Sequence, residues 1–187
     1  VIFYFYPVYL PTYQANTQIL TLLITPATVA LAIPLYKYRE TIKKNIKPLA
    51  LGITGAVVSH ALVLGVLSKL LKLNNVLIAS LTPKSVTTAI AKEIAFSLRG
   101  EPSITIPVVI ITGILGSILS ESLRSILKIK SDAAHGLALG ASAHAMGTSK
   151  ALEEGEVEGV YASIALVLTG LVTVALSPLI YTIITNI

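Results

Sequence analysis

The chain has 187 residues, of which 54% are hydrophobic and only 12% are charged, and its mean hydropathy is +0.82. Because about a quarter of the residues in soluble domains are charged, this composition excludes an ordinary soluble fold and indicates an integral membrane protein. The net charge of +5 comes from basic residues between apolar runs, which is typical of cytoplasmic loops and argues against a nucleic-acid-binding surface.

A membrane-spanning helix needs about 20 apolar residues, so the length allows roughly six spans within a single transmembrane domain, residues 1–187. Residues 1–10 are rich in Phe and Tyr and form either the end of a span or an interfacial aromatic segment. Because the chain does not begin with methionine, we expect a truncated N-terminus and a further span before it. Residues 19–36 form the first clear span, which Pro26 and Pro34 are expected to kink.

The segment 37–47 is predicted to be a cytoplasmic loop. It carries five basic residues against one glutamate, and the positive-inside rule places such a loop in the cytoplasm. The next span covers residues 48–71 and contains glycines that allow close helix packing. His60 lies near its middle, where a histidine is either a hydrogen-bonded packing residue or part of a proton path.

Residues 75–96 form the first of two interrupted segments. The apolar sequence VLIASL stops at Thr82-Pro83-Lys84-Ser85 and then resumes as VTTAIAKEIAF. Proline disfavours helix in the residue before it and suits the first turn of a helix that follows. We therefore expect a break over residues 82–84 and a new helix that begins near Ser85, with free amides and the positive end of its dipole at the break.

Residues 104–127 form a further apolar span. Near its end, Glu121 and Arg124 are spaced so that they can pair on one helix face. After the second interrupted segment, an acidic loop over residues 153–158 leads to the last span, residues 160–184.

The second interrupted segment, residues 134–154, contains two of the three histidines of the chain, His135 and His144. Several glycines and Lys150 accompany them at a position where apolar residues would be the simplest solution for a membrane span. This pattern suggests a polar site at membrane depth. We expect a break beside His144 and a helix that begins near Gly147.

The chain shows a weak internal repeat. Ile53-Thr54-Gly55 recurs as Ile111-Thr112-Gly113, and each copy precedes one interrupted segment. Three further residues, Lys84, Thr88 and Glu93, are in step with His144, Thr148 and Glu153. A straight helix followed by a broken helix, repeated after roughly 60 residues, is typical of transporters with internal repeats. The two units run parallel if both broken segments span the membrane, and they are inverted if both are re-entrant.

Three stretches resemble the LrgB/CidB family of membrane proteins: ITPATVALAIPLYK at 24–37, LTPKSVTTAIAKEI at 81–94 and AHGLALGASAHAMGTSKALEEGEVEG at 134–159. The plant plastid glycolate/glycerate translocator is similar to that family over its C-terminal half. One departure is Ala89, where the family pattern has proline.

The resemblance implies a multi-pass protein of the plasma membrane that acts with a small membrane partner of the LrgA/CidA type. Two roles are attached to the family. One is the transport of small carboxylates such as glycolate, glycerate or pyruvate. The other is an antiholin-like influence on murein hydrolase activity and lysis.

The sequence therefore predicts an all-α integral membrane protein, a polytopic helical bundle with two interrupted helices that are either discontinuous or re-entrant. We expect a small carboxylate to bind between the two breaks, in a homo-oligomeric protein coupled to protons or sodium. The expected substrate-binding residues are Pro83, Lys84, Ser85, Thr87, Thr88, His144, Gly147, Thr148 and Ser149. The candidates for coupling are His144, Glu93 and Glu153.

Two other interpretations remain open. A holin-like or regulatory protein would explain the apolar spans and the partner, but it gives no reason for the PKS and GTSK sequences at membrane depth. An enzyme is disfavoured because the chain has no cysteine and no nucleophile–base or metal-ligand pattern, and we expect no cofactor and no metal. Glu93 and Glu153 can also simply neutralise Lys92 and Lys150 at the membrane edge.

Overall fold

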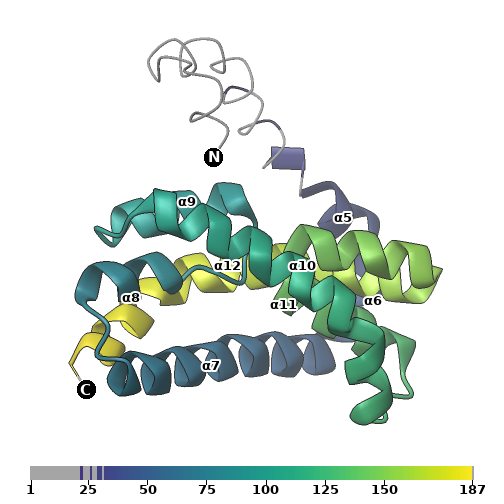
Figure 1. The fold of residues 1–187 in the computed structure, drawn as a ribbon. Helices are drawn as coiled ribbons and strands as arrows, with labels where there is room; N and C mark the ends of the chain where they lie inside the picture. Colours follow the sequence, from purple (N-terminus) through teal and green to yellow (C-terminus); the bar gives the residue numbers. More distant parts are fainter. Residues whose placement is uncertain (1–21, 23–25, 27–28, 31, 187) are drawn as a thin grey trace, which may run out of the picture.

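The computed structural model describes residues 22, 26, 29, 30 and 32–186 (Figure 1). This part of the chain forms eight helices, α5 to α12, and its described residues include no strand. The all-α class that the composition indicated is confirmed. The predicted aromatic segment 1–10 and half of the predicted span 19–36 lie outside the described residues.

The basic segment that follows is mostly helical. α5 covers Ala32–Lys37 and α6 covers Arg39–Lys44. Lysine, arginine and glutamate are good helix formers, and the Lys43 ammonium lies 3.3 Å from the Glu40 carboxylate one turn earlier. The prediction of a loop here is wrong, because a high charge does not prevent a helix where the side chains reach water.

Three helices are long and apolar enough to cross a membrane. Their most apolar windows have mean hydropathies of 2.0, 2.0 and 2.2. They are α7 (Ile46–Leu70), α10 (Pro102–Ile126) and α12 (Glu156–Thr185). Spans are confirmed where the sequence predicts them over 48–71, 104–127 and 160–184. α10 starts earlier than predicted because Pro102 occupies its first turn, where proline costs no hydrogen bond.

The predicted acidic loop over 153–158 is wrong. α11 covers Asp132–Glu154 and α12 begins at Glu156, so Gly155 alone separates them. Glu156 and Glu158 lie in the first turn of α12, where the positive end of the helix dipole stabilises carboxylates. The acidic residues therefore belong to helix ends.

The remaining helices lie between α7 and α10 in the sequence: α8 covers Asn75–Leu81 and α9 covers Thr88–Ser97. Figure 1 shows α7 along one edge of the bundle and α9 along the opposite edge, with α12 between them. α12 contacts α7, α8, α9 and α11, which makes it the central helix of the described bundle.

α11 and α12 pack at very short distance. A Cβ atom on Gly136 would collide with the backbone of Glu158, and one on Gly140 would collide with the backbone of Ala162. Small residues four positions apart let two helix backbones approach in this way in membrane proteins. This contact fixes α11 against the central helix.

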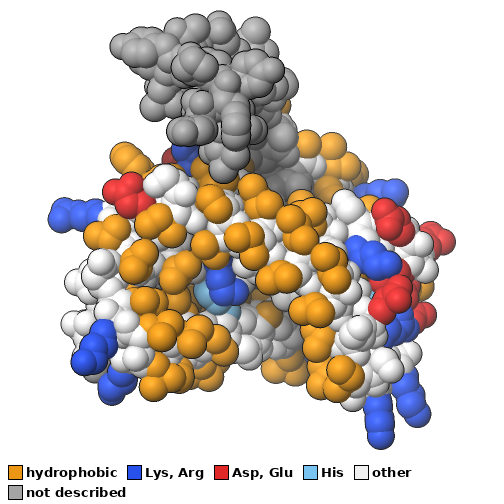
Figure 2. Space-filling model, in the orientation of Figure 1, with side chains coloured by type: hydrophobic (Ala, Val, Ile, Leu, Met, Phe, Trp, Pro, Cys, Tyr) orange, Lys and Arg blue, Asp and Glu red, His pale blue; other side chains and the backbone are white. Residues whose placement is uncertain are grey.

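The outer surface is apolar over most of the face in Figure 2, with charged side chains gathered toward the two ends. Large exposed side chains include Leu51, 75% exposed, and Ile118, 69% exposed. Contact of such side chains with lipid tails costs no free energy, whereas their contact with water is unfavourable. The surface therefore fits a bundle whose long helices cross a bilayer.

Candidate functional site

The first interruption covers residues 82–87, between the end of α8 and the start of α9. We call this segment the linker. It is longer than predicted, because α9 begins at Thr88 and not near Ser85. The Thr87 hydroxyl accepts a hydrogen bond from the Ile90 amide at 3.5 Å, so Thr87 is the N-cap of α9.

The linker and the end of α8 are attached to both neighbouring long helices. Nε2 of His60 in α7 lies 2.8 Å from the carbonyl oxygen of Thr82. A carbonyl can only accept, so Nε2 carries the hydrogen. On the other side, the hydroxyl of Thr105 in α10 donates to the Ser80 carbonyl at 2.9 Å. The linker is thereby held between α7 and α10.

Inside the linker, polar and apolar side chains are placed differently. Pro83 and Val86 are buried. Lys84 is half-buried, and its Nζ lies 3.3 Å from the Ser85 hydroxyl. The positive charge of Lys84 acts on the imidazoles of both His60 and His144. Figure 2 shows a basic side chain beside a histidine in a hollow in the middle of an otherwise apolar face.

A small cavity of about 10 Å³ lies next to the linker. Thr82 and Ser85 contribute one wall, and α7 contributes His60. The opposite walls come from α11, at Ala141, and from α12, at Thr169 and Thr173. Four separate parts of the chain therefore meet at this point.

The second interruption is a single residue, His144, within α11. Its backbone angles, φ 44° and ψ −128°, are not helical. A positive φ is rare for residues other than glycine and costs about 1–3 kcal/mol. Nε2 of His144 lies 2.9 Å from the Val109 carbonyl of α10, and the Thr148 hydroxyl donates to the His144 carbonyl at 2.9 Å. The break lies at His144 itself, so the helix that follows it begins before Gly147, the predicted start.

The chain reverses direction at this residue. Nδ1 of His135, near the start of α11, lies 3.2 Å from the Glu154 carboxylate at its end. Between them, a Cβ atom on Gly147 would collide with the Leu139 carbonyl and would lie 2.7 Å from Cβ of Ala143. The two halves of α11 therefore lie side by side.

An ionic cluster closes the ends of α10, α11 and α12. Arg124 donates to the Glu158 carboxylate at 3.2 Å, and the Glu158 side chain is only 8% exposed. Arg124 also donates to Asp132. Lys150 lies 3.2 Å from Glu121. The predicted pairing of Glu121 with Arg124 is wrong, because each finds its partner on another helix. No local spacing signals this cluster, since its members come from three helices.

The ion-pair partner of Lys150 within α11 also differs from the prediction: it is Glu154, at 3.4 Å, and not Glu153. Glu153 is exposed. Glu93 is exposed as well, with its carboxylate 3.9 Å from the Lys92 ammonium. These two coupling candidates therefore lie on the surface of the described bundle.

The predicted substrate-binding residues fall into two groups. Ser85 lines the small cavity, and Lys84 lies next to it with its Nζ 3.3 Å from the Ser85 hydroxyl. The cavity wall on α11 is Ala141, three residues before His144. Thr148 is buried within α11, while Ser149 is exposed. That both groups contact one substrate stays a prediction. Thr169 and Thr173, which also line the cavity, were not predicted, because threonines in an apolar span carry no local signal of a site.

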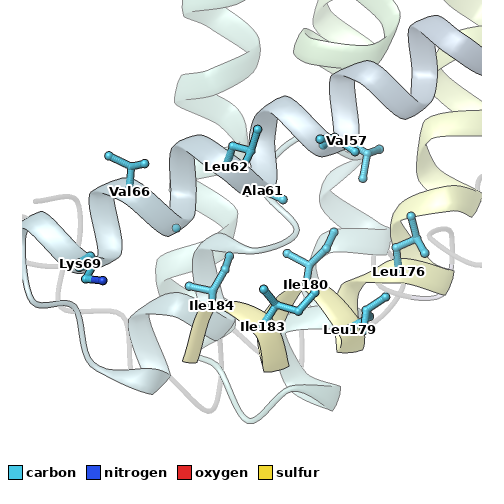
Figure 3. A pocket seen from close by; sticks show the side chains of 12 residues that line it. Val57, Ala61, Leu62, Val66, Lys69, Leu176, Leu179, Ile180, Ile183 and Ile184 are labelled. Atoms are coloured by element: carbon cyan, nitrogen blue, oxygen red, sulfur yellow. The ribbon is translucent and has the colours of Figure 1, made fainter. Parts of the chain in front are cut away.

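A larger cavity, about 440 Å³, is a groove between α7 and α12 (Figure 3). Its walls are aliphatic, with Lys69 at one end as the charged residue of the described lining. A carboxylate needs several convergent hydrogen-bond donors, which this groove does not offer among its described residues. The candidate site is therefore the linker and not this groove.

Comparison with known proteins agrees with the membrane fold. A family model described as LrgB-like family matches residues 1–183. Uncharacterized protein YwbG of Bacillus subtilis (strain 168) is 39% identical over 171 residues, which are 89% of this chain and 74% of the relative. Antiholin-like protein LrgB of the same organism is 35% identical over 166 residues, 89% of this chain and 72% of the relative. No solved structure matches. The chain belongs to the LrgB-like family and is a multi-pass protein of the plasma membrane.

Proposed function

We propose that this protein is a secondary transporter of small monocarboxylates, and that the anion binds between the linker and the turn of α11 at His144. The observation that carries the proposal is Lys84, a half-buried lysine in a non-helical segment, bonded to the Ser85 hydroxyl at 3.3 Å. A charge at membrane depth is costly and usually serves a function. A bound carboxylate offsets that cost.

The start of α9 supports the same site. The first amides of a helix have no partner within the helix, and together with the positive end of its dipole they bind anions. Thr87 caps this helix and Thr88 is its first residue. Their hydroxyls, with that of Ser85, suit the hydroxyl group of glycolate, glycerate or lactate. Buried Pro83 fixes the backbone before Lys84.

The turn of α11 forms the other half of the proposed site. Lys84 is close enough for its charge to act on His144. Gly147 permits the tight reversal, and Thr148 satisfies the carbonyl that the break frees. Ser149, which is exposed, completes the set of proposed binding residues.

The topology also supports transport. We interpret both interruptions as re-entrant hairpins, one entering from each side of the membrane, which makes the two units an inverted repeat. In each unit a histidine ties the straight helix to the interruption that follows it: His60 to Thr82, and His144 to Val109. Secondary transporters commonly place substrate where two such repeats meet near the midplane.

Transport against a gradient requires coupling to protons or sodium. Of the three candidates from the sequence, Glu93 and Glu153 are exposed, while His144 is buried near Lys84. His144 is therefore the one of the three that lies within the proposed site. The transporter acts as a homo-oligomer, with or without a partner of the LrgA/CidA type.

A second candidate function is antiholin-like control of murein hydrolase activity and lysis with such a partner. The name of one relative, Antiholin-like protein LrgB, favours it. A pore formed by this protein would pass solutes without selection, whereas a transporter would bind one class of anion.

Purified protein in liposomes separates the two functions. Uptake of radiolabelled glycolate, glycerate, lactate and pyruvate is measured beside leakage of a trapped dye. Saturable uptake of at least one carboxylate without dye leakage is the result that we expect. Uptake of none of the four overturns the transport proposal, and solute-independent leakage supports a pore.

A further inference from the structure

The cavity beside the linker has a feature that a carboxylate site does not explain. Two polar atoms on its walls, Nδ1 of His60 and Oγ1 of Thr169, are buried and have no hydrogen-bond partner among the described residues. Leaving such atoms unpaired is unfavourable, because the hydrogen bonds that they make to water in the unfolded chain are not replaced. Thr169 is only 2% exposed, so open solvent does not satisfy it.

The size of the cavity limits what can pair them. About 10 Å³ is close to the room that one water-sized molecule needs, and it is far too small for a carboxylate. A sodium ion prefers several oxygen ligands, whereas one wall here presents an imidazole nitrogen and Lys84 stands close by. The chemistry therefore fits a water molecule.

We propose that this cavity binds one water molecule between His60 and Thr169, and that His60 takes up the proton that travels with the carboxylate. The inference rests on the proposed transport function. Nε2–H of His60 is donated to the Thr82 carbonyl, so Nδ1 presents a lone pair to the water. Ser85 borders the same cavity, and its hydroxyl can donate or accept a hydrogen bond on the side where the substrate binds.

The proton balance is simple. The bound water gives a proton to Nδ1 as it receives one from the solution on the uptake side, so no hydroxide remains, and the ring becomes an imidazolium that donates from both nitrogens. When the substrate leaves on the other side, Nδ1 returns the proton to water. One carboxylate and one proton cross together, so the step moves no net charge.

The charges around His60 give a reason for coupling. Lys84 is the charged group that acts on it from the linker, while the facing residues of α11 and α12, Ala141, Thr169 and Thr173, do not titrate. Two positive charges close together repel each other, and a carboxylate bound beside Lys84 removes that repulsion. Proton and anion therefore favour each other's binding. His144 keeps a positioning role, because its Nε2 is held by Val109 at the strained turn.

The test uses two assays on reconstituted protein. Counterflow exchanges labelled for unlabelled carboxylate and needs no net proton movement, whereas accumulation driven by a pH gradient does. His60→Gln keeps a donor for the Thr82 carbonyl and cannot be protonated. We expect it to retain counterflow and to lose gradient-driven accumulation by about tenfold or more.

Thr169→Val provides the second variant, since it removes the hydroxyl while it keeps the shape. It should lower gradient-driven accumulation with counterflow intact, while Thr182→Val, at an exposed position on the same helix, should behave as wild type.

If the wild type shows no counterflow, the transport proposal fails and this inference fails with it. Normal counterflow together with undiminished accumulation in His60→Gln and Thr169→Val overturns this inference alone. Loss of both activities in a folded His60→Gln protein assigns His60 a structural role and also overturns it.

Discussion

Nδ1 of His135 lies 3.2 Å from the carboxylate of Glu154, although the two residues stand near opposite ends of α11. In a straight helix of 23 residues the ends would be about 33 Å apart. The contact is possible because the chain reverses at His144, and it sets the topology of the second interrupted segment.

Both ends of α11 are therefore expected on one side of the membrane. The chain has no cysteine, so single cysteines at Lys130 and at Glu153, both exposed, report accessibility without background. An impermeant thiol reagent applied to intact cells should leave both unlabelled, as it should a cysteine at Lys44 in the basic segment that is predicted to be cytoplasmic. Labelling of one α11 end and not the other would show that α11 spans the membrane.

The strained backbone of His144 predicts an unusual order of stability. His144→Ala loses the bond to Val109 and keeps a side chain at positive φ, whereas His144→Gly loses the same bond and relieves the strain. We expect the glycine variant to be more stable than the alanine variant by about 1 kcal/mol, the reverse of the order inside a regular helix. Thermal unfolding in detergent, followed by circular dichroism, measures the difference. An alanine variant that is equal or better would place His144 in ordinary helix.

The contact of α11 with α12 predicts that a single methyl group is harmful at Gly140. Its Cβ would collide with the Ala162 carbonyl, and overpacking of this kind costs about 1–3 kcal/mol. Gly55→Ala in α7 is the matched control, because its Cβ meets nothing within 4 Å and alanine favours the helix. Unfolding temperatures should fall for Gly140→Ala and stay level or rise for Gly55→Ala. Equal effects of the two changes would contradict the close packing.

The ionic cluster predicts different costs for two nearby glutamates. Glu158, 8% exposed, holds Arg124, so Glu158→Gln leaves a cation without its buried partner and should cost about 1–2 kcal/mol, given that Arg124 is itself partly exposed. Glu153 is exposed, and Glu153→Gln should change the unfolding free energy by less than about 0.5 kcal/mol. Denaturant titration of both variants provides the comparison. A larger loss for Glu153→Gln would refute this account of the cluster.

The proposed anion site predicts a specific role for Lys84. Lys84→Gln removes the positive charge beside Ser85 and should raise KM for the carboxylate by about 10- to 100-fold, the usual value of a charge-assisted hydrogen bond. Lys69→Gln is the control, because Lys69 lies at the end of the apolar groove between α7 and α12. Initial rates of uptake into liposomes give both values. If the two variants share an unchanged KM, the anion binds elsewhere.

Much of the fold could be predicted from local patterns. The apolar runs placed α7, α10 and α12, and the TPKS sequence placed the first interruption, because proline and lysine are costly inside a membrane helix. Helix ends were less accurate. The cap at Thr87 and the single separating residue Gly155 were missed, since neighbouring Ser, Thr and Glu residues offer several equivalent ends.

The sequence by itself determined the membrane class, the long helices and the two polar interruptions, because these depend on residues close together in the chain. Only the tertiary structure decided that α11 reverses at His144, that Arg124 pairs with Glu158, and that His60 meets Thr169 at one small cavity. These relationships join residues from different helices, and hydropathy and spacing along one helix carry no information about them. The reversal depends on close packing against α12 and on the ionic cluster, which exist only once the helices have assembled.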